Sequence, residues 1–308
     1  MVAVVAFWTT HPPCASEYPW YTRFSDPAYG GESKFAMARL TDPFDIIRRQ
    51  AEPREEFGLE QILQLYDGCV AQFDHEVGRI VDYLEDTGLA SDTIVVIYSD
   101  HGMEFFEHGA WGQGNSALGD YSSRVPLLIV DPRRDGGRTV DATVRSIDLA
   151  PTLLELCGCK PGVQMDGRSL VATLDGEPPV PSVAYNETGI WLSDIPGMPA
   201  DHLRYPGIVE LLEIPNPISG TLALKPEHRA AIVAAKDRFV TAARWKLVYQ
   251  PLTSGYRLSL YDTAADPGCR DDVAARRPDV RDAMWRELVP FLVRDGVIDD
   301  AQLASAAS

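Results

Sequence analysis

The stretch TIVVIYSDHGMEFFEHGAWGQGNSALGDYSSRVPLLIV, from Thr93 to Val130, decides the fold of this chain. It opens with Thr93 to Ile97, a run of β-branched residues without polar alternation that is typical of a strand buried on both faces. Asp100 and His101 follow this run, and Gly102 permits a sharp turn after them. Ligands of open α/β sheets bind beyond the carboxyl ends of the strands. The pattern therefore predicts a site containing Asp100 and His101 at the edge of a sheet.

Helical and extended patterns alternate around this stretch. Apolar residues recur at steps of three and four from Leu59 to Thr87, which predicts a long helix, and Gly88 is placed to end it. The second apolar run, Val125 to Val130, predicts another buried strand, and Val2 to Phe7 predicts a first one. A helix followed by a buried strand is typical of a parallel sheet. These patterns indicate an α/β main domain.

The carboxyl-terminal part has a different pattern. A change in composition at residues 176–181 predicts a boundary between a main domain, residues 1–176, and a subdomain, residues 177–308. In the subdomain, short alternating runs predict four strands and a periodic segment predicts a closing helix: Val183 to Glu187, Phe239 to Ala243, Trp245 to Gln250, Tyr256 to Tyr261, and Pro278 to Val293. This order indicates a small antiparallel sheet packed with one helix.

Composition excludes several classes of function. The net charge of −17 argues against nucleic acid as a partner, because phosphate backbones are bound by clustered lysine and arginine. No apolar run approaches the roughly 20 residues of a membrane span. The apolar start lacks a basic region and a cleavage site, so it does not read as a signal peptide, and we expect a cytoplasmic location. The five cysteines do not form the even set of a small disulfide framework.

Four short motifs carry a family resemblance. In order, they are Ser99-Asp100-His101-Gly102, Glu107-His108-Gly109, Gly112-Gln113-Gly114 and Arg124-Val125-Pro126-Leu127. With these motifs the chain resembles the sulfatase family of the alkaline phosphatase superfamily. Further similar segments are Asp148 to Leu154, Asp166 to Leu170 and Trp245 to Tyr249. The resemblance implies an α/β alkaline-phosphatase-like sandwich, with a mostly parallel central sheet and a small C-terminal antiparallel sheet plus helix.

The resemblance also implies roles for individual residues. It makes Asp100 and His101 ligands of a divalent metal, and His108 a catalytic acid or a sulfate contact. It makes His11, in a His-x-Pro motif after the first predicted strand, and Gln113 substrate-binding residues. Calcium is the metal that the family implies. Manganese and zinc stay open as alternatives, because calcium prefers six to eight oxygen ligands and an imidazole nitrogen suits manganese or zinc better.

Two features depart from the family pattern. Relatives place lysine or histidine where this chain has Gln113, and an amide carries no charge and cannot act as an acid. The family nucleophile, a cysteine or serine in Cys-x-Pro-x-Arg that becomes formylglycine, has no counterpart, since the nearest string, Cys159 to Val163, lacks the arginine. These departures predict a chain that lacks an amino-terminal half and that is incomplete or inactive alone.

Three functions follow as hypotheses. The first is a metal-dependent sulfuric ester hydrolase acting on a small sulfate ester. The second is a phosphonate or phosphodiester hydrolase, or a phospho-group transferase, of the same superfamily, acting on a phosphate ester. The third is a noncatalytic binding subunit that retains the fold without the nucleophile.

Overall fold

The computed structural model describes residues 2–12, 14–30, 58–109, 111–114, 116–134, 136–191 and 198–298. The chain forms two compact units. The first comprises residues 1–97 and 127–136, and the second comprises residues 98–126 and 137–308. The predicted division at residue 176 stays a prediction. The strand that precedes Asp100 ends at the change of unit.

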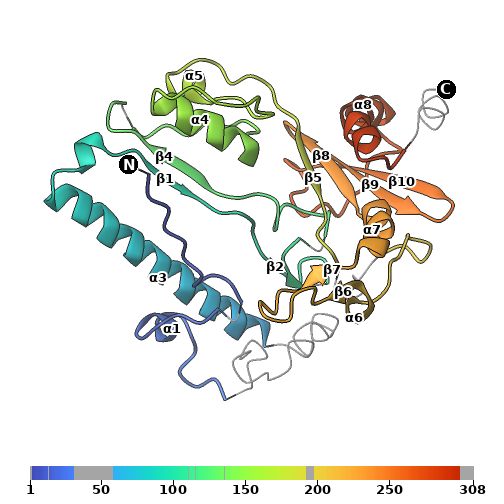
Figure 1. The fold of residues 1–308 in the computed structure, drawn as a ribbon, viewed down its shortest axis with the longest axis horizontal. Coiled ribbons are helices and arrows are strands. Elements are labelled where there is room, and N and C mark those ends of the chain that lie inside the picture. Colours follow the sequence, from blue (N-terminus) through green and yellow to red (C-terminus); the bar gives the residue numbers. More distant parts are fainter. Residues whose placement is uncertain are drawn as a thin grey trace. The chain divides into compact units, whose positions relative to one another are not determined.

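The first unit is built on a long helix and two short strands. Helix α3 spans Leu59–Asp86, close to its predicted range, and Gly88 follows it with a φ of 72°, a left-handed conformation that suits glycine. The short helix α1, Trp20–Arg23, packs on α3 where Gly68 lets the Trp20 carbonyl approach. Strand β1, Val95–Tyr98, pairs with β4, Leu127–Val130 (Figure 1). The 3-10 helix η3, Ala90–Asp92, joins α3 to β1.

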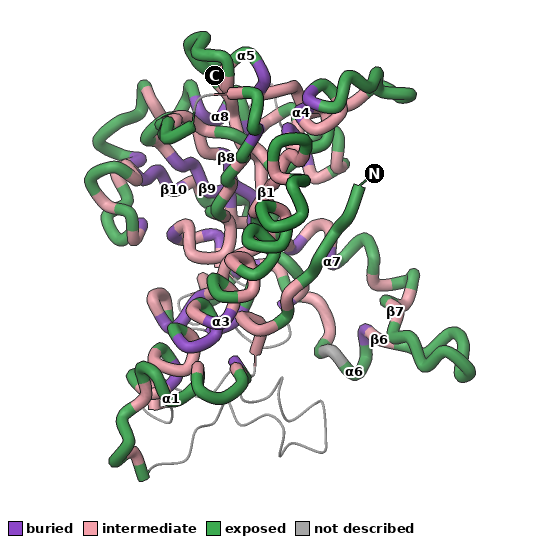
Figure 2. Tube along the Cα trace, turned by 90° about the vertical axis from the view of Figure 1, so that its left-hand side faces the viewer, coloured by how far each residue is buried: buried purple, intermediate pink, exposed green. Residues whose placement is uncertain are grey.

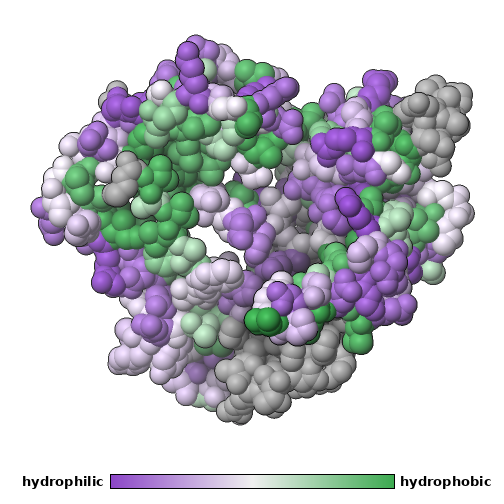
Figure 3. Space-filling model, in the orientation of Figure 1, coloured by the Kyte–Doolittle hydropathy of each residue, from purple (hydrophilic) through white to green (hydrophobic). Residues whose placement is uncertain are grey.

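Two predictions for this unit were wrong. Residues 2–8 form no strand, and Val2 and Val4 are 85% and 83% exposed. A strand requires a neighbour that completes its hydrogen bonds, which an apolar run cannot reveal. The run before Asp100 was expected to be buried on both faces, yet no residue of β1 is fully buried and Tyr98 is 53% exposed. Leu128 and Val130 of β4 are likewise 52% and 56% exposed. Figure 3 shows apolar residues gathered on the surface where β4 lies.

The second unit contains the predicted small antiparallel sheet. Its strand order is β10-β9-β8-β5, with β5 Ala184–Glu187, β8 Arg238–Ala242, β9 Trp245–Leu252 and β10 Gly255–Asp262, all neighbours antiparallel. The closing helix α8 spans Pro278–Arg294. The structure thus confirms the α/β class with a small antiparallel sheet and helix at the carboxyl-terminal end. Buried stretches concentrate in β8, β9 and β10 (Figure 2).

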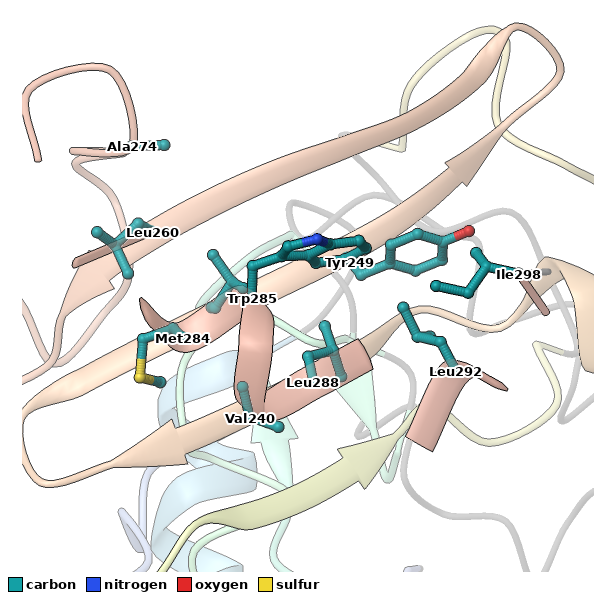
Figure 4. Packing of buried hydrophobic residues seen from close by; sticks show 10 residues of the cluster. Val240, Tyr249, Leu260, Ala274, Met284, Trp285, Leu288, Leu292 and Ile298 are labelled. Atoms are coloured by element: carbon teal, nitrogen blue, oxygen red, sulfur yellow. The ribbon is translucent and has the colours of Figure 1, made fainter. Parts of the chain in front are cut away.

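Both faces of strand β9 are buried, which makes it the centre of this unit. One face, with Leu247 and Tyr249, packs on Leu288 and Leu292 of α8, together with Trp285 (Figure 4). The opposite face of β9 carries Val248. This residue lies in a smaller cluster with these buried neighbours: Ala117, Phe239, Tyr261 and Cys269. Because side chains alternate along a strand, Lys246 lies on the same face as Val248. A charged residue is therefore placed in an apolar layer.

Shorter elements of the second unit come before β5 in the chain or between β5 and β8. They are β2 Glu104–Phe105, β3 Trp111–Gly112, η4 Ser146–Asp148, α4 Leu149–Leu156, α5 Val171–Leu174, α6 Ile208–Leu211, β6 Leu212–Glu213, β7 Ala223–Leu224, η5 Pro226–His228 and α7 Arg229–Ala235. The strands β2 and β3 form an antiparallel pair, and so do β6 and β7. No helix in the described ranges has the length and apolar character needed to cross a membrane.

The Asp148 side chain links the two family-like segments Asp148 to Leu154 and Asp166 to Leu170. Its fully buried carboxylate accepts hydrogen bonds from the Arg145 backbone and guanidinium and from the Arg168 backbone. Burial alone raises the pKa of this carboxyl, but the hydrogen bonds from Arg145 and Arg168 outweigh burial and hold the pKa below its ordinary value. Gly167 is required here because a Cβ would lie 1.9 Å from the Ile147 carbonyl oxygen. Asp148 is therefore structural.

Candidate active site

Asp100 and His101 leave the end of β1 and turn toward each other. The His101 backbone N–H donates to Asp100 Oδ1 at 3.0 Å, and Asp100 Oδ2 lies 3.8 Å from His101 Nε2. His101 Nδ1 lies 2.8 Å from the Gly102 carbonyl oxygen, which can only accept a hydrogen bond. Nδ1 therefore carries the proton in the neutral ring, and Nε2 keeps its lone pair. A carboxylate oxygen and a basic nitrogen face the same small volume.

This donor pair fits two positions in the shell of a divalent cation. The Asp100 side chain is 83% exposed and that of His101 is 34% exposed, so both donors are accessible. Within the described ranges, no group of three or more histidine, cysteine, aspartate or glutamate side chains is arranged to hold a metal. The other positions of a shell would need water, substrate or further protein groups. An imidazole nitrogen in the set suits manganese or zinc better than calcium.

Gly102 is needed for close packing rather than for the turn that its position predicted. Its φ is not in the left-handed range, where glycine is favoured. Its N–H donates to the Ser122 carbonyl at 2.9 Å, and a Cβ on Gly102 would lie 2.0 Å from the Tyr121 carbonyl oxygen. The segment after the metal-ligand candidates is thus fixed against residues 121–122.

His108 lies in a network of hydrogen bonds. Its Nδ1 contacts Glu104 Oε1 at 2.9 Å and its Nε2 contacts the Gly268 carbonyl oxygen at 2.6 Å. Burial lowers the pKa of the imidazole, but the hydrogen bonds to Glu104 and Gly268 outweigh it, and the net effect raises the pKa. Both ring nitrogens act as donors only in the imidazolium form. The geometry therefore favours a charged His108 beside Glu104, which is 2% exposed.

Gln113 and His11 have few contacts of their own. Gln113 is exposed between Gly112 and Gly114, whose φ values are 122° and 67°, and its side chain makes no hydrogen bond with the part of the chain that is described. His11 belongs to the first compact unit, where Nδ1 lies 2.8 Å from the Pro12 carbonyl oxygen and the ring lies 5.7 Å from that of Trp8. Both assignments to substrate binding stay predictions.

Sequence reasoning missed the groups that hold the His108 loop. Glu104 precedes the Glu107-His108-Gly109 motif without belonging to it, and Lys246 lies within the family-like segment Trp245 to Tyr249. Lys246 is fully buried, and its ammonium donates to the Gly119 carbonyl and to Asp120 Oδ1, the latter at 3.3 Å. A lysine in the apolar string Trp245 to Tyr249 was the available signal. Only the contact with residues 119 and 120 shows its relation to the site.

The five cysteines form no disulfide bond with one another. All five are free thiols; Cys14, Cys69 and Cys269 are buried, whereas Cys157 and Cys159 are exposed. Burial raises the pKa of Cys14 to about 12, with a further contribution from the neighbouring Cys69. Thiolate chemistry at neutral pH is thus suppressed at Cys14.

The α/β fold with a small antiparallel sheet and a closing helix is that of alkaline-phosphatase-like proteins. Residues 1–159 match the family model named Sulfatase, and the chain belongs to the sulfatase family. A Formosa agariphila protein named "Sulfatase" is 36% identical over 112 residues, which cover 36% of this chain and 22% of that protein. The "Multifunctional alkaline phosphatase superfamily protein PehA" of Trinickia caryophylli is 29% identical over 200 residues, which cover 56% of this chain and 37% of that protein.

Solved structures agree in fold. The crystal structure of a phosphonate monoester hydrolase of Agrobacterium radiobacter matches with a TM-score of 0.63 and 24% identity, over 92% of this chain and 55% of that chain. The likeness shows a shared fold. The matched regions cover less than two thirds of these relatives, so the activity of a whole protein is a matter of proposal.

Proposed function

We propose that this chain carries part of the active site of a metal-dependent sulfate ester hydrolase. The observation that carries the proposal is the Asp100–His101 pair, in which Asp100 Oδ2 lies 3.8 Å from His101 Nε2 while Nδ1 is occupied by the Gly102 carbonyl. Membership of the sulfatase family supports the ester class. In this proposal both side chains hold a divalent cation. The family resemblance implies calcium, whereas the imidazole nitrogen donor favours manganese or zinc. A bound cation neutralises charge that develops on the ester oxygens.

His108 is the proposed proton donor to the leaving oxygen. Its raised pKa keeps it protonated at higher pH than an ordinary histidine, which suits a general acid. Both of its protons are now donated, to Glu104 and to Gly268, so transfer requires that the ester oxygen replace one acceptor. His11 and Gln113 are the proposed contacts to the sulfate group. Gln113 offers an amide where the family offers a cation, so its contribution would be a neutral hydrogen bond.

The nucleophile is proposed to come from an amino-terminal segment with Cys-x-Pro-x-Arg. Two observations support this proposal: the motif is absent from all 308 residues, and the regions matched to two curated relatives cover only 22% and 37% of them. Activity would then require that segment, with its cysteine converted to formylglycine.

A phosphonate or phosphate diester is the second candidate substrate. The fold match to a phosphonate monoester hydrolase extends over 92% of this chain, and the curated relative PehA is described as multifunctional. The two substrate classes share a tetrahedral anionic centre beside a metal. Relative turnover of matched aryl sulfate and aryl phosphonate esters, by the protein with its amino-terminal segment, separates them.

The metal site is tested first by calorimetry with Mn²⁺, Zn²⁺ and Ca²⁺ on the chain itself. We expect one site, and we expect Asp100→Asn and His101→Gln each to weaken it by more than the roughly 10–100-fold that loss of an outer-shell partner causes. Asp141→Asn, at an exposed residue, is the matched control. Equal affinity of the wild type and both variants for every metal would refute the proposed ligands. No binding even with the amino-terminal segment present would favour the noncatalytic subunit.

The acid role is tested by leaving-group dependence. An alkyl sulfate has a poor leaving group that needs a proton, whereas nitrophenyl sulfate does not. His108→Gln should lower turnover of the alkyl ester by about 10²–10⁴-fold and that of the nitrophenyl ester far less. Equal losses for both esters would contradict proton donation and leave His108 as a binding residue.

A further inference from the structure

Lys246 is a buried cation that the proposed reaction does not use. Its side chain has no exposed surface, and burial lowers the pKa of its ammonium while the Asp120 carboxylate opposes that effect. A buried charge costs several kcal/mol unless its hydrogen bonds are satisfied. Lys246 donates to the Gly119 carbonyl and to Asp120 Oδ1, and it lies 3.9 Å from the centroid of the Phe239 ring. The ammonium thus contacts two hydrogen-bond acceptors and an aromatic face.

The residue that Lys246 holds lies directly against His108. Gly119 has a φ of 66°, and a Cβ built on it would lie 2.8 Å from His108 Cε1 and 2.6 Å from Cε2 of Tyr121. The backbone at Gly119 therefore forms a wall beside the imidazole. The Tyr121 ring lies 5.7 Å from that of His108 and continues this wall. Moving Gly119 would remove the surface on which the imidazole rests.

The hydrogen bond of His108 to the Gly268 carbonyl depends on the same face of β8 and β9 that buries Lys246. Its Nε2 is bonded to the Gly268 carbonyl, and the next residue, Cys269, is buried with Phe239 and Val248. The Phe239 ring also contacts the Lys246 ammonium. The β8–β9 face thus fixes two segments, residues 119–120 and residues 268–269, that enclose the ring.

We propose that Lys246 is a positioning residue for His108, holding Gly119 against the imidazole so that the ring stays between Glu104 and the Gly268 carbonyl. The chemistry assigned to His108 rests on the proposed function, but the positioning itself does not. A site on rigid elements holds its side chains more precisely than one on loops, and strand β9 supplies that rigidity to residues 119–120 through Lys246.

Charge gives the proposal a measurable signature. The titratable groups that act on His108 are Glu104, which raises its pKa, and Lys246, which lowers it. Asp120 balances Lys246, the Tyr121 ring lies beside the imidazole, and the thiol of Cys269 follows Gly268 in the chain. Removing the ammonium removes a repulsive charge from the imidazolium. His108 should then titrate at a higher pH, and Gly119 should no longer be held in place against its ring.

The experiment is an NMR titration of the chain with ¹³C-labelled histidine, following the His108 Cε1–H signal, which His108→Gln assigns. Lys246→Met should displace this signal and raise the pH at which it titrates, and Lys246→Arg should restore the titration toward that of the wild type. Lys236→Met is the matched control, because Lys236 pairs with Glu187 near the same sheet and its side chain is 19% exposed. Thermal unfolding of each variant shows that it is folded.

An unchanged His108 signal and titration in folded Lys246→Met would overturn the proposal, and so would an equal change in Lys236→Met. If Lys246→Met does not fold, Asp120→Asn replaces it. That variant removes the carboxylate partner at 3.3 Å and leaves the ammonium in place. It should displace the His108 signal and shift its titration to lower pH; no displacement would overturn the proposal. None of these readouts needs turnover, so a failed hydrolase assay leaves the result interpretable.

Discussion

Replacing Asp148 with asparagine should destabilise the protein strongly although the two side chains have the same shape. Asp148 Oδ2 accepts the Arg145 backbone N–H at 3.0 Å, and Oδ1 accepts the Arg168 backbone N–H at 3.0 Å. An asparagine has one carbonyl oxygen, so its NH₂ group must face one of these two donors. The variant therefore leaves a buried N–H without an acceptor and leaves Arg145 without its counter-charge.

The size of the effect follows from burial. Removing one partner of a buried ion pair costs about 3–5 kcal/mol. The Asp148 side chain is 0% exposed, but that of Arg145 is 22% exposed and can recover water, so the lower end of the range applies. A loss of about 3 kcal/mol corresponds to a fall in Tm of roughly 6–12 °C for a domain of 150–250 residues. Calorimetry of Asp148→Asn, with Asp141→Asn as the exposed control, measures this fall.

The pH dependence gives an independent check. The pKa of Asp148 is depressed in the folded protein, so its contribution is present above the pKa of the unfolded carboxyl, about 3.9, and is lost as the pH falls through the lower folded value. The wild type and Asp148→Asn should differ fully at pH 7 and converge below about pH 4. A Tm difference below 2 °C at pH 7, or one that does not shrink in acid, would refute this account.

Three further predictions use the same structure. In helix α3, Gly78→Ala should stabilise the protein by about 0.5–1 kcal/mol, because no described atom lies within 4 Å of its Cβ position. Gly68→Ala should instead destabilise it, because the new Cβ would lie 2.8 Å from the Trp20 carbonyl oxygen. Urea unfolding measures both changes, and equal effects of the two variants would contradict the packing. Gly102→Ala should displace residues 121–122 and lower Tm, and an unchanged Tm would contradict the 2.0 Å contact. With a thiol reagent, the exposed Cys157 and Cys159 should react in the native protein and the three buried thiols only after unfolding; a third fast thiol would contradict the burial.

Local patterns were enough to predict the two long helices and the strands of the carboxyl-terminal sheet. The long helix and the four strands and closing helix of the carboxyl-terminal sheet lie within a few residues of their predicted ranges. These elements bury apolar residues at a regular period, so each is determined by its own sequence. The prediction of a strand at Val2 to Phe7 was wrong because a strand also requires a partner strand, which no local pattern reveals.

The site divides in the same way. The sequence by itself determined that Asp100 and His101 follow a strand and that the chain carries sulfatase motifs, because these are statements about neighbours along the chain. Only the tertiary structure decided that His101 keeps Nε2 unprotonated, that His108 lies between Glu104 and Gly268, and that Lys246 stands behind Gly119. The contacts of His108 with Gly268 and of Lys246 with Gly119 join residues more than a hundred positions apart. The packing of sheet and loops fixes these two contacts, and no periodicity in the sequence encodes them.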